Sequence, residues 1–85
     1  MKRYTFDDMR ELVLDIIETK IVLAGLDRKK IPNEIDLLMT GIIDSFDFID
    51  MICAVEDSTG LTVDLSQVDN KSFTTLEGFV KEILS

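Results

Sequence analysis

The sequence lacks the side chains on which most catalytic sites depend. Its 85 residues include no histidine and no tryptophan, and cysteine, proline and tyrosine occur once each. Without histidine, and with no paired base near Ser45, the chain has no group that would activate the hydroxyl of this serine as a nucleophile. The lone Cys53 excludes an internal disulfide and is typical of a reducing compartment. We therefore expect a non-catalytic protein of the cytoplasm.

Long apolar runs and basic clusters are also missing. No stretch of 18 apolar residues is present, so the sequence predicts no membrane span. The N-terminus becomes acidic at Asp7, before the apolar segment of a signal peptide could form. The net charge of −8 argues against binding of nucleic acid, which requires clustered Lys and Arg. The length favours a single domain over residues 1–85, and we expect a monomer.

The negative charge is concentrated in the middle of the chain. Residues 1–30 contain seven Lys or Arg and six acidic residues, and residues 71–85 are balanced. Residues 31–70 contain nine acidic residues and no basic one. A field of one sign can steer a basic partner toward a site, although acidic side chains can also serve solubility alone.

The hydrophobic spacing predicts an all-α fold. A first helix is expected from about Thr5 to Leu23, with Thr5 and Asp8 as a capping box and Gly25 as the stop. Its apolar stripe follows helical periodicity and comprises Phe6, Met9, Val13, Ile16, Ile17 and Ile21. A long loop containing Pro32 and Asn33 follows, and four of its apolar residues should cover the core, namely Ile35, Leu37, Leu38 and Ile42.

Further helices are predicted in the second half. One should run from about Ser45 to Ser58, with Asp44 as its N-cap and Gly60 at its end. Ser66 could cap a brief turn over 67–70. Thr74-Thr75-Leu76-Glu77 resembles a capping box that opens a last helix with apolar residues at helical spacing, namely Leu76, Phe79, Val80, Ile83 and Leu84. Three main helices, one short helix and a long first loop indicate a small four-helix bundle.

The helix over 45–58 is predicted to have two different faces. On a helical wheel, one face is apolar and should join the core, comprising Phe48, Met51, Ile52 and Val55. The opposite face alternates apolar and acidic residues, namely Phe46, Asp50, Cys53 and Asp57, with Asp47 close by. Such a face is typical of a docking surface. Alternatively, the preceding loop could cover part of Phe46.

Ser45 is the first residue of this helix. The unpaired N–H groups and the positive end of the helix dipole would favour a phosphate ester on its hydroxyl. Asp44 adds negative charge beside such an ester, but could also be a handle or a metal ligand for an enzyme that modifies the serine. A serine with no role beyond starting the helix is the alternative.

The segment Gly41-Ile42-Ile43-Asp44-Ser45-Phe46 resembles the signature of acyl and peptidyl carrier proteins. Three later segments resemble the same family in register. They are residues 50–57, which resemble its acidic recognition helix, residues 60–63, and residues 73–80 at the start of the final helix. The resemblance is continuous from about Leu37 to Leu84.

The resemblance implies a four-helix carrier fold with a 4′-phosphopantetheine arm on Ser45, attached from coenzyme A by a phosphopantetheinyl transferase. The arm would carry an acyl group as a thioester to partner enzymes, such as a ligase, a synthase or an acyltransferase with a basic docking patch. Positions matching the family's docking surface are Asp44, Phe46, Asp47, Asp50, Cys53, Glu56 and Asp57. No metal site is implied in the carrier itself.

Other functions are consistent with the same residues. An aminoacyl carrier, D-alanyl or peptidyl, loaded by an adenylating ligase would have a similar sequence, and an acidic interaction module would leave Ser45 unmodified. A calcium-binding loop over 64–77 is excluded, because it has no Asp-x-Asp-x-Asp pattern and no Gly at the sixth position.

Overall fold

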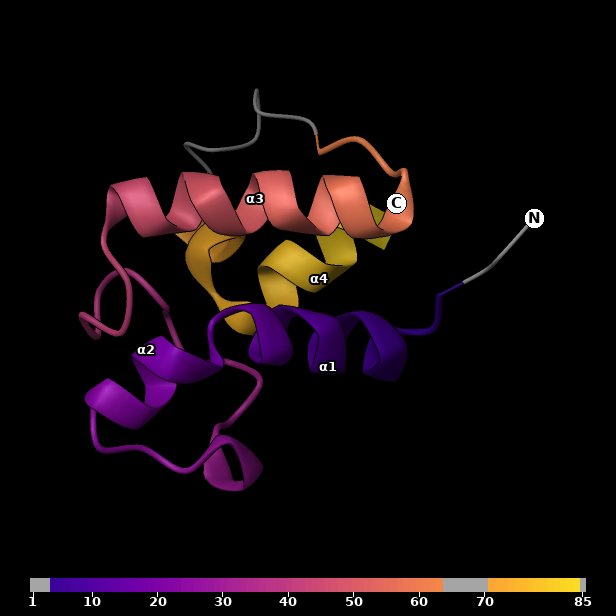
Figure 1. Ribbon diagram of the computed structural model, residues 1–85. Helices are drawn as coiled ribbons and strands as arrows, with labels where there is room; N and C mark the ends of the chain where they lie inside the picture. The colour runs from indigo at the N-terminus through magenta and orange to yellow at the C-terminus, as the bar shows by residue number, and fades with distance from the viewer. Residues whose placement is uncertain (1–3, 64–70, 85) are drawn as a thin grey trace.

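A computed structural model describes residues 4–63 and 71–84, and within these ranges the protein is all-helical, as predicted (Figure 1). The described residues form four α-helices, with 3-10 turns at η1 (Arg28–Lys30) and η3 (Lys71–Thr74). The helices are α1 (Phe6–Ile16), α2 (Glu18–Leu23), α3 (Ser45–Thr59) and α4 (Leu76–Leu84). The described ranges contain no strand, only an isolated antiparallel bridge between Asp36 and Thr75. The turn predicted over 67–70, with its cap Ser66, lies outside the described residues.

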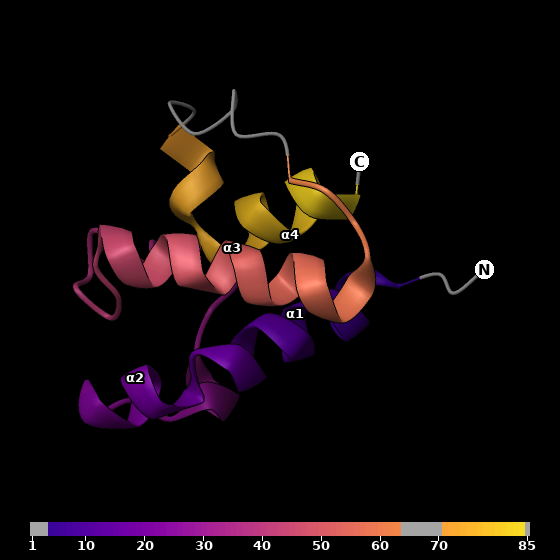
Figure 2. The same ribbon diagram turned by 45° about the horizontal axis from the view of Figure 1, so that its top comes forward.

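The core forms where α1, α3 and α4 meet (Figures 1 and 2). Three phenylalanine rings join α3, η3 and α4 in edge-to-face contacts. Phe48, Phe73 and Phe79 have ring centroids 5.6 to 5.9 Å apart and are at most 3% exposed. Such contacts add stability to the burial of the rings. The predicted apolar face of α3 therefore points into the core.

The first helix is broken, contrary to the prediction of one helix from Thr5 to Leu23. Helix α1 ends at Ile16, and α2 begins at Glu18. Ile17 lies between them with φ −101° and ψ 12°, outside the helical region, but its side chain is buried. Adjacent β-branched residues at 16 and 17 weaken helix propensity. The predicted capping box of Thr5 and Asp8 is confirmed.

Arg28 connects both sides of this break. Its guanidinium donates hydrogen bonds to Asp15 in α1 at 2.6 Å and to Glu18 in α2 at 3.1 Å. It also donates to the Glu11 carboxylate at 3.1 Å. Both bonds raise the pKa of the Arg28 guanidinium, and the bond to Asp15 contributes more than the bond to Glu18. The positive charge of Arg28 is therefore fixed. The η1 turn therefore holds α1 and α2 in their bent arrangement.

Replacing Arg28 with glutamine should lower the free energy of unfolding by about 1 kcal/mol, because the partly exposed acids lose their shared cation. Urea denaturation followed by circular dichroism would measure the loss, which should shrink at about 1 M salt. Lys29→Gln is the matched control, since no salt bridge joins Lys29 to the residues described. Equal effects of the two variants would contradict a bridging role for Arg28.

The long loop before α3 is attached to the start of α4. Asp36 accepts a hydrogen bond from the Thr74 hydroxyl at 2.8 Å, and the Glu77 N–H donates to the Asn33 carbonyl at 2.8 Å. The predicted capping box from Thr74 to Glu77 is therefore wrong. Thr75 is the cap, and its hydroxyl accepts from the Gly78 N–H at 3.0 Å. The four loop residues predicted to cover the core are buried or partly buried.

Candidate functional site

Ser45 is exposed as the first residue of α3, as predicted. The cap of this helix is formed by its neighbours. Asp44 accepts a hydrogen bond from the Asp47 N–H at 2.8 Å, and Asp47 accepts one from the Asp44 N–H at 3.4 Å. No hydrogen bond joins the Ser45 hydroxyl to another of the described residues. Because the capping box uses both flanking acids, the serine side chain is left available for chemistry.

The segment before Ser45 is held firmly on the core. Ile42 and Ile43 are 5% and 2% exposed, and the Ile43 N–H donates to the Leu37 carbonyl at 3.2 Å. Gly41 turns the chain with φ +78°, a conformation that suits glycine. Two buried isoleucines thus fix where the Asp44-Ser45 pair emerges at the surface.

The exposed residues of α3 match the outward face that the helical wheel predicted. Phe46 is 79% exposed, and Asp50, Cys53 and Asp57 are exposed as well. The alternative that the loop covers Phe46 is therefore wrong. Ile49 is also 56% exposed and was missing from the predicted face, although a wheel places it only about 60° from Phe46. The spacing could have revealed it.

Besides Asp44, whose carboxylate belongs to the cap, two further predicted contact residues have structural partners. Asp47 is half-buried and, besides its part in the cap, lies 3.5 Å from the Lys20 ammonium of α2. Glu56 accepts a hydrogen bond from the Val63 N–H at 2.8 Å, which fastens the chain after α3. The acidic apolar surface consists of Phe46, Ile49, Asp50, Cys53 and Asp57, with Asp44 and Ser45 at its end. Among these side chains, only the Asp44 carboxylate, through the cap, is engaged by a hydrogen bond within the described ranges. We refer to these seven residues as the α3 face.

Lys20 is a site residue that the sequence did not indicate. It places a positive charge beside the first turn of α3, and its side chain is 45% exposed. Only the bend at Ile17 and the packing of α2 bring it there. It also lines a groove of about 290 Å³ between the α1–α2 junction and α3, together with Ile16, Ile17, Ile43, Asp47, Asp50, Met51 and Ala54.

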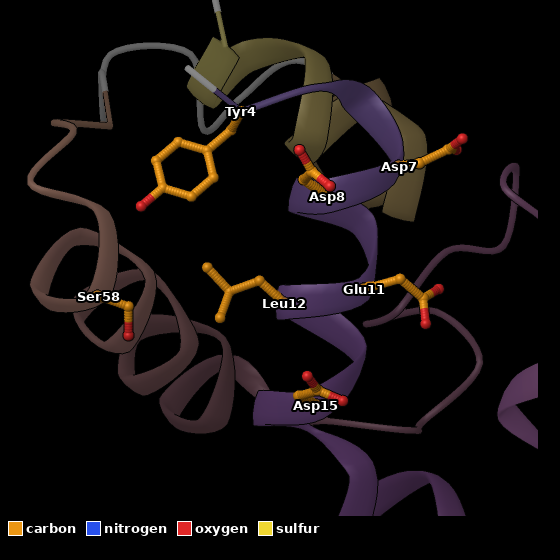
Figure 3. Close-up of a pocket in the computed structure, with 7 residues that line it drawn as sticks. All are labelled: Tyr4, Asp7, Asp8, Glu11, Leu12, Asp15 and Ser58. Carbon is orange, nitrogen blue, oxygen red and sulfur yellow. The ribbon is translucent and has the colours of Figure 1, made fainter. Parts of the chain in front are cut away.

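A larger cavity, of about 520 Å³, lies at the other end of α3 (Figure 3). Tyr4 and Leu12 point into it from the first part of the chain, and Ser58 faces it from α3. Ser58 is separated from Ser45 by about 20 Å along the helix. This cavity is therefore separate from the candidate site.

Two kinds of feature are absent from residues 4–63 and 71–84, namely membrane-spanning helices and metal-binding clusters. No helix there is both long and apolar enough to cross a bilayer. No group of three or more Cys, Asp or Glu side chains in the same ranges is arranged to hold a metal ion.

Comparison of the chain with protein families, with curated proteins and with solved structures finds no match in any of the three.

Proposed function

We propose that this protein is an acyl carrier protein in which Ser45 is the attachment point of a 4′-phosphopantetheine arm. The in-register resemblance of residues 37–84 to carrier proteins is the sequence support. The structural support is the arrangement around Ser45, which combines an exposed hydroxyl with an adjacent acidic apolar face. The carrier itself performs no catalysis in this proposal.

The observation that carries the proposal is the identity of the helix cap. A serine at the start of a helix usually accepts a hydrogen bond from a backbone N–H and so caps the helix, but here Asp44 and Asp47 form the cap. The Ser45 side chain does not take part in the cap, and the residue is exposed. These properties are required of a residue that a second enzyme must reach and esterify.

The surroundings of Ser45 also fit a phosphodiester. The start of α3 provides the positive end of the helix dipole, and Lys20 adds a cation beside Asp47. Asp44 and Asp47 oppose an anion, but both carboxylates accept hydrogen bonds within the cap. Once attached, the arm supplies a terminal thiol that holds an acyl or aminoacyl group as a thioester. Ser45 provides only the anchoring oxygen.

Incubation with coenzyme A and a broad-specificity phosphopantetheinyl transferase tests the proposal. Intact-mass measurement should show the addition of one phosphopantetheine to the wild type. An unchanged mass would favour the alternative of an unmodified acidic interaction module. A subsequent test with acyl-transferring and adenylating ligases would distinguish acyl from aminoacyl cargo.

Reversal of the charges at Asp50 and Asp57 should slow this modification. Both carboxylates are exposed on the α3 face, so Asp50→Lys/Asp57→Lys removes the field that steers a basic transferase toward Ser45. We expect kcat/KM at low salt to fall by about tenfold or more, and the difference to shrink as salt rises.

Asp7→Lys/Glu34→Lys is the matched control, because it changes the net charge equally at two exposed residues outside α3. Its kcat/KM should remain near that of the wild type. Circular dichroism would verify that both double variants remain helical. Equal rates for the two variants would show that net charge, and not the α3 face, governs the encounter.

A further inference from the structure

Two cavities lie where α1 and α3 pack against each other, one toward each end of this contact. The cavity of about 520 Å³ is lined by residues between Tyr4 and Asp15 on the side of α1, and by Ser58 near the end of α3. The groove of about 290 Å³ is lined by Ile16 at the end of α1 and by residues of the first half of α3. The two helices are therefore antiparallel, as Figure 1 shows. We refer to the residues that line both cavities as the α1–α3 seam.

The residues that α3 contributes to the seam lie on one flank of this helix. They are Asp47, Asp50, Met51, Ala54 and Ser58. Their spacing of three or four residues is that of a single helical stripe, which is about 17 Å long. A wheel places Ser45 about 180° from Ala54, so the seam is separate from the candidate modification site.

The floor of the seam is apolar and partly open. Leu12 and Ile16 of α1 and Ala54 of α3 line the cavities and are only partly buried. The Tyr4 and Leu12 side chains point into the larger cavity in Figure 3. An apolar furrow between two helices is a surface on which an amphipathic helix of a partner can lie.

Acidic side chains line both walls of the seam. Four of the residues that line the larger cavity are Asp or Glu, and the smaller one has two Asp beside Lys20. Lys20 and Arg28 form salt bridges with some of these acids. Asp8 on α1 and Asp50 on α3 form no salt bridge with any residue in 4–63 or 71–84. Each wall therefore offers a carboxylate to a cation from outside.

We propose that the α1–α3 seam binds a basic amphipathic helix of a partner protein. The apolar side of this helix contacts the floor, and its Lys or Arg side chains reach Asp8 and Asp50. Asp8 lines the same cavity as Ser58, and Ser58 follows Asp50 by about 12 Å along α3. The partner therefore needs cations about two helical turns apart, on either side of a central apolar residue.

Charge also separates this occupant from a second copy of the chain. Two copies repel each other, because each has a net charge of −8. Among the helices of a second copy, α3 has no Lys or Arg, and α1, α2 and α4 have one each. The η1 turn has three cations but is a single turn, and its Arg28 is engaged by acids of its own chain. A separate basic helix is therefore the better complement to the seam.

Fluorescence anisotropy with a labelled peptide tests the inference. The probe is a peptide of about 18 residues in which leucine and lysine follow a helical period, and the reference peptide has the same composition in scrambled order. The full chain should bind the periodic peptide about tenfold more tightly than the scrambled one. The binding should weaken as the salt concentration rises.

Ala54→Gln and Cys53→Gln form a matched pair. The two residues are neighbours in α3, but Ala54 lines the seam whereas Cys53 is exposed on the α3 face. Ala54→Gln should weaken binding of the periodic peptide by about fivefold or more, because the bound helix would bury the new amide without a hydrogen-bond partner. Cys53→Gln should bind within about twofold of the wild type.

Neutralisation of the two walls is a second, independent change. Asp8→Asn/Asp50→Asn should weaken binding about threefold or more, and the asparagine at position 8 keeps an oxygen that can accept the Thr5 N–H in the cap. Asp27→Asn/Glu34→Gln is the control, since it removes the same charge at exposed positions outside α1 and α3. Circular dichroism would verify that each variant is folded.

Equal binding of the two peptides to the wild type, or equal effects of Ala54→Gln and Cys53→Gln, would overturn the inference. If Ala54→Gln does not fold, equal effects of the two double variants would overturn it instead. Sedimentation velocity without peptide covers the second copy, because association that either seam variant abolishes would identify a contact between copies and refute a partner helix. The inference is independent of the carrier proposal, so Ser45→Ala should bind the peptide normally.

Discussion

Replacement of Ser45 with alanine is expected to abolish the addition of phosphopantetheine completely. The arm requires an ester oxygen, and alanine offers none. The fold should be unaffected, because Asp44 and Asp47 form the cap of α3 and the Ser45 side chain is exposed. We expect the free energy of unfolding to change by less than about 0.5 kcal/mol, so a loss of modification can be assigned to chemistry.

Ser58→Ala provides the control for this experiment. Ser58 is also exposed on α3, but it lies at the far end of the helix and should not be modified. The variant should gain one arm at the wild-type rate, as measured by intact mass over time. Modification of Ser45→Ala to the same extent would place the attachment point elsewhere and refute the role assigned to Ser45.

Replacement of Phe79 with alanine should have the largest effect on stability. The ring is 0% exposed and lies 5.8 and 5.9 Å from the rings of Phe48 and Phe73. Removing such a buried aromatic side chain costs about 3–5 kcal/mol. A chain of this size has only about 4–13 kcal/mol of stability in total. The loss is therefore a large fraction of the total, and circular dichroism should show a urea midpoint far below that of the wild type.

Phe46→Ala is the matched control for Phe79→Ala. The Phe46 side chain is 79% exposed, so its loss should change the free energy of unfolding by less than about 0.5 kcal/mol. Phe79→Leu should show an intermediate loss of about 1–2 kcal/mol, measurable by urea denaturation. Wild-type stability of Phe79→Ala would contradict a core built on the three rings.

The second half of the fold was largely predictable because its signals are local. The helix predicted from Ser45 to Ser58 is observed from Ser45 to Thr59, with the predicted cap at Asp44 and the predicted end at Gly60. Its periodicity separated the buried residues from the exposed ones. A periodic stripe assigns faces reliably when one side of a helix is buried and the other is exposed.

The errors occur where distant residues compete with local preference. The β-branched pair at 16 and 17 weakens the helix locally, and Arg28, 13 positions from Asp15, donates hydrogen bonds to Asp15 and Glu18 on the two sides of the break. The cap at Thr75, in place of Thr74, depends on Asp36, which engages the Thr74 hydroxyl. Partners so far away in the chain leave no trace in a local pattern, since a capping motif describes only the residues within it.

The sequence by itself determined the helical class, the position of Ser45 at the start of α3 and the acidic apolar character of the surrounding face. These features follow from periodicity, capping and charge, which are properties of neighbouring residues. Only the tertiary structure decided that Lys20 lies beside Asp47 and that Glu56 is held by the Val63 N–H. It also decided that Val22, Leu23 and Leu26 are left uncovered. The physical reason is that the exposure and ion pairing of a side chain depend on which elements lie next to it, and the packing of the whole chain determines those neighbours.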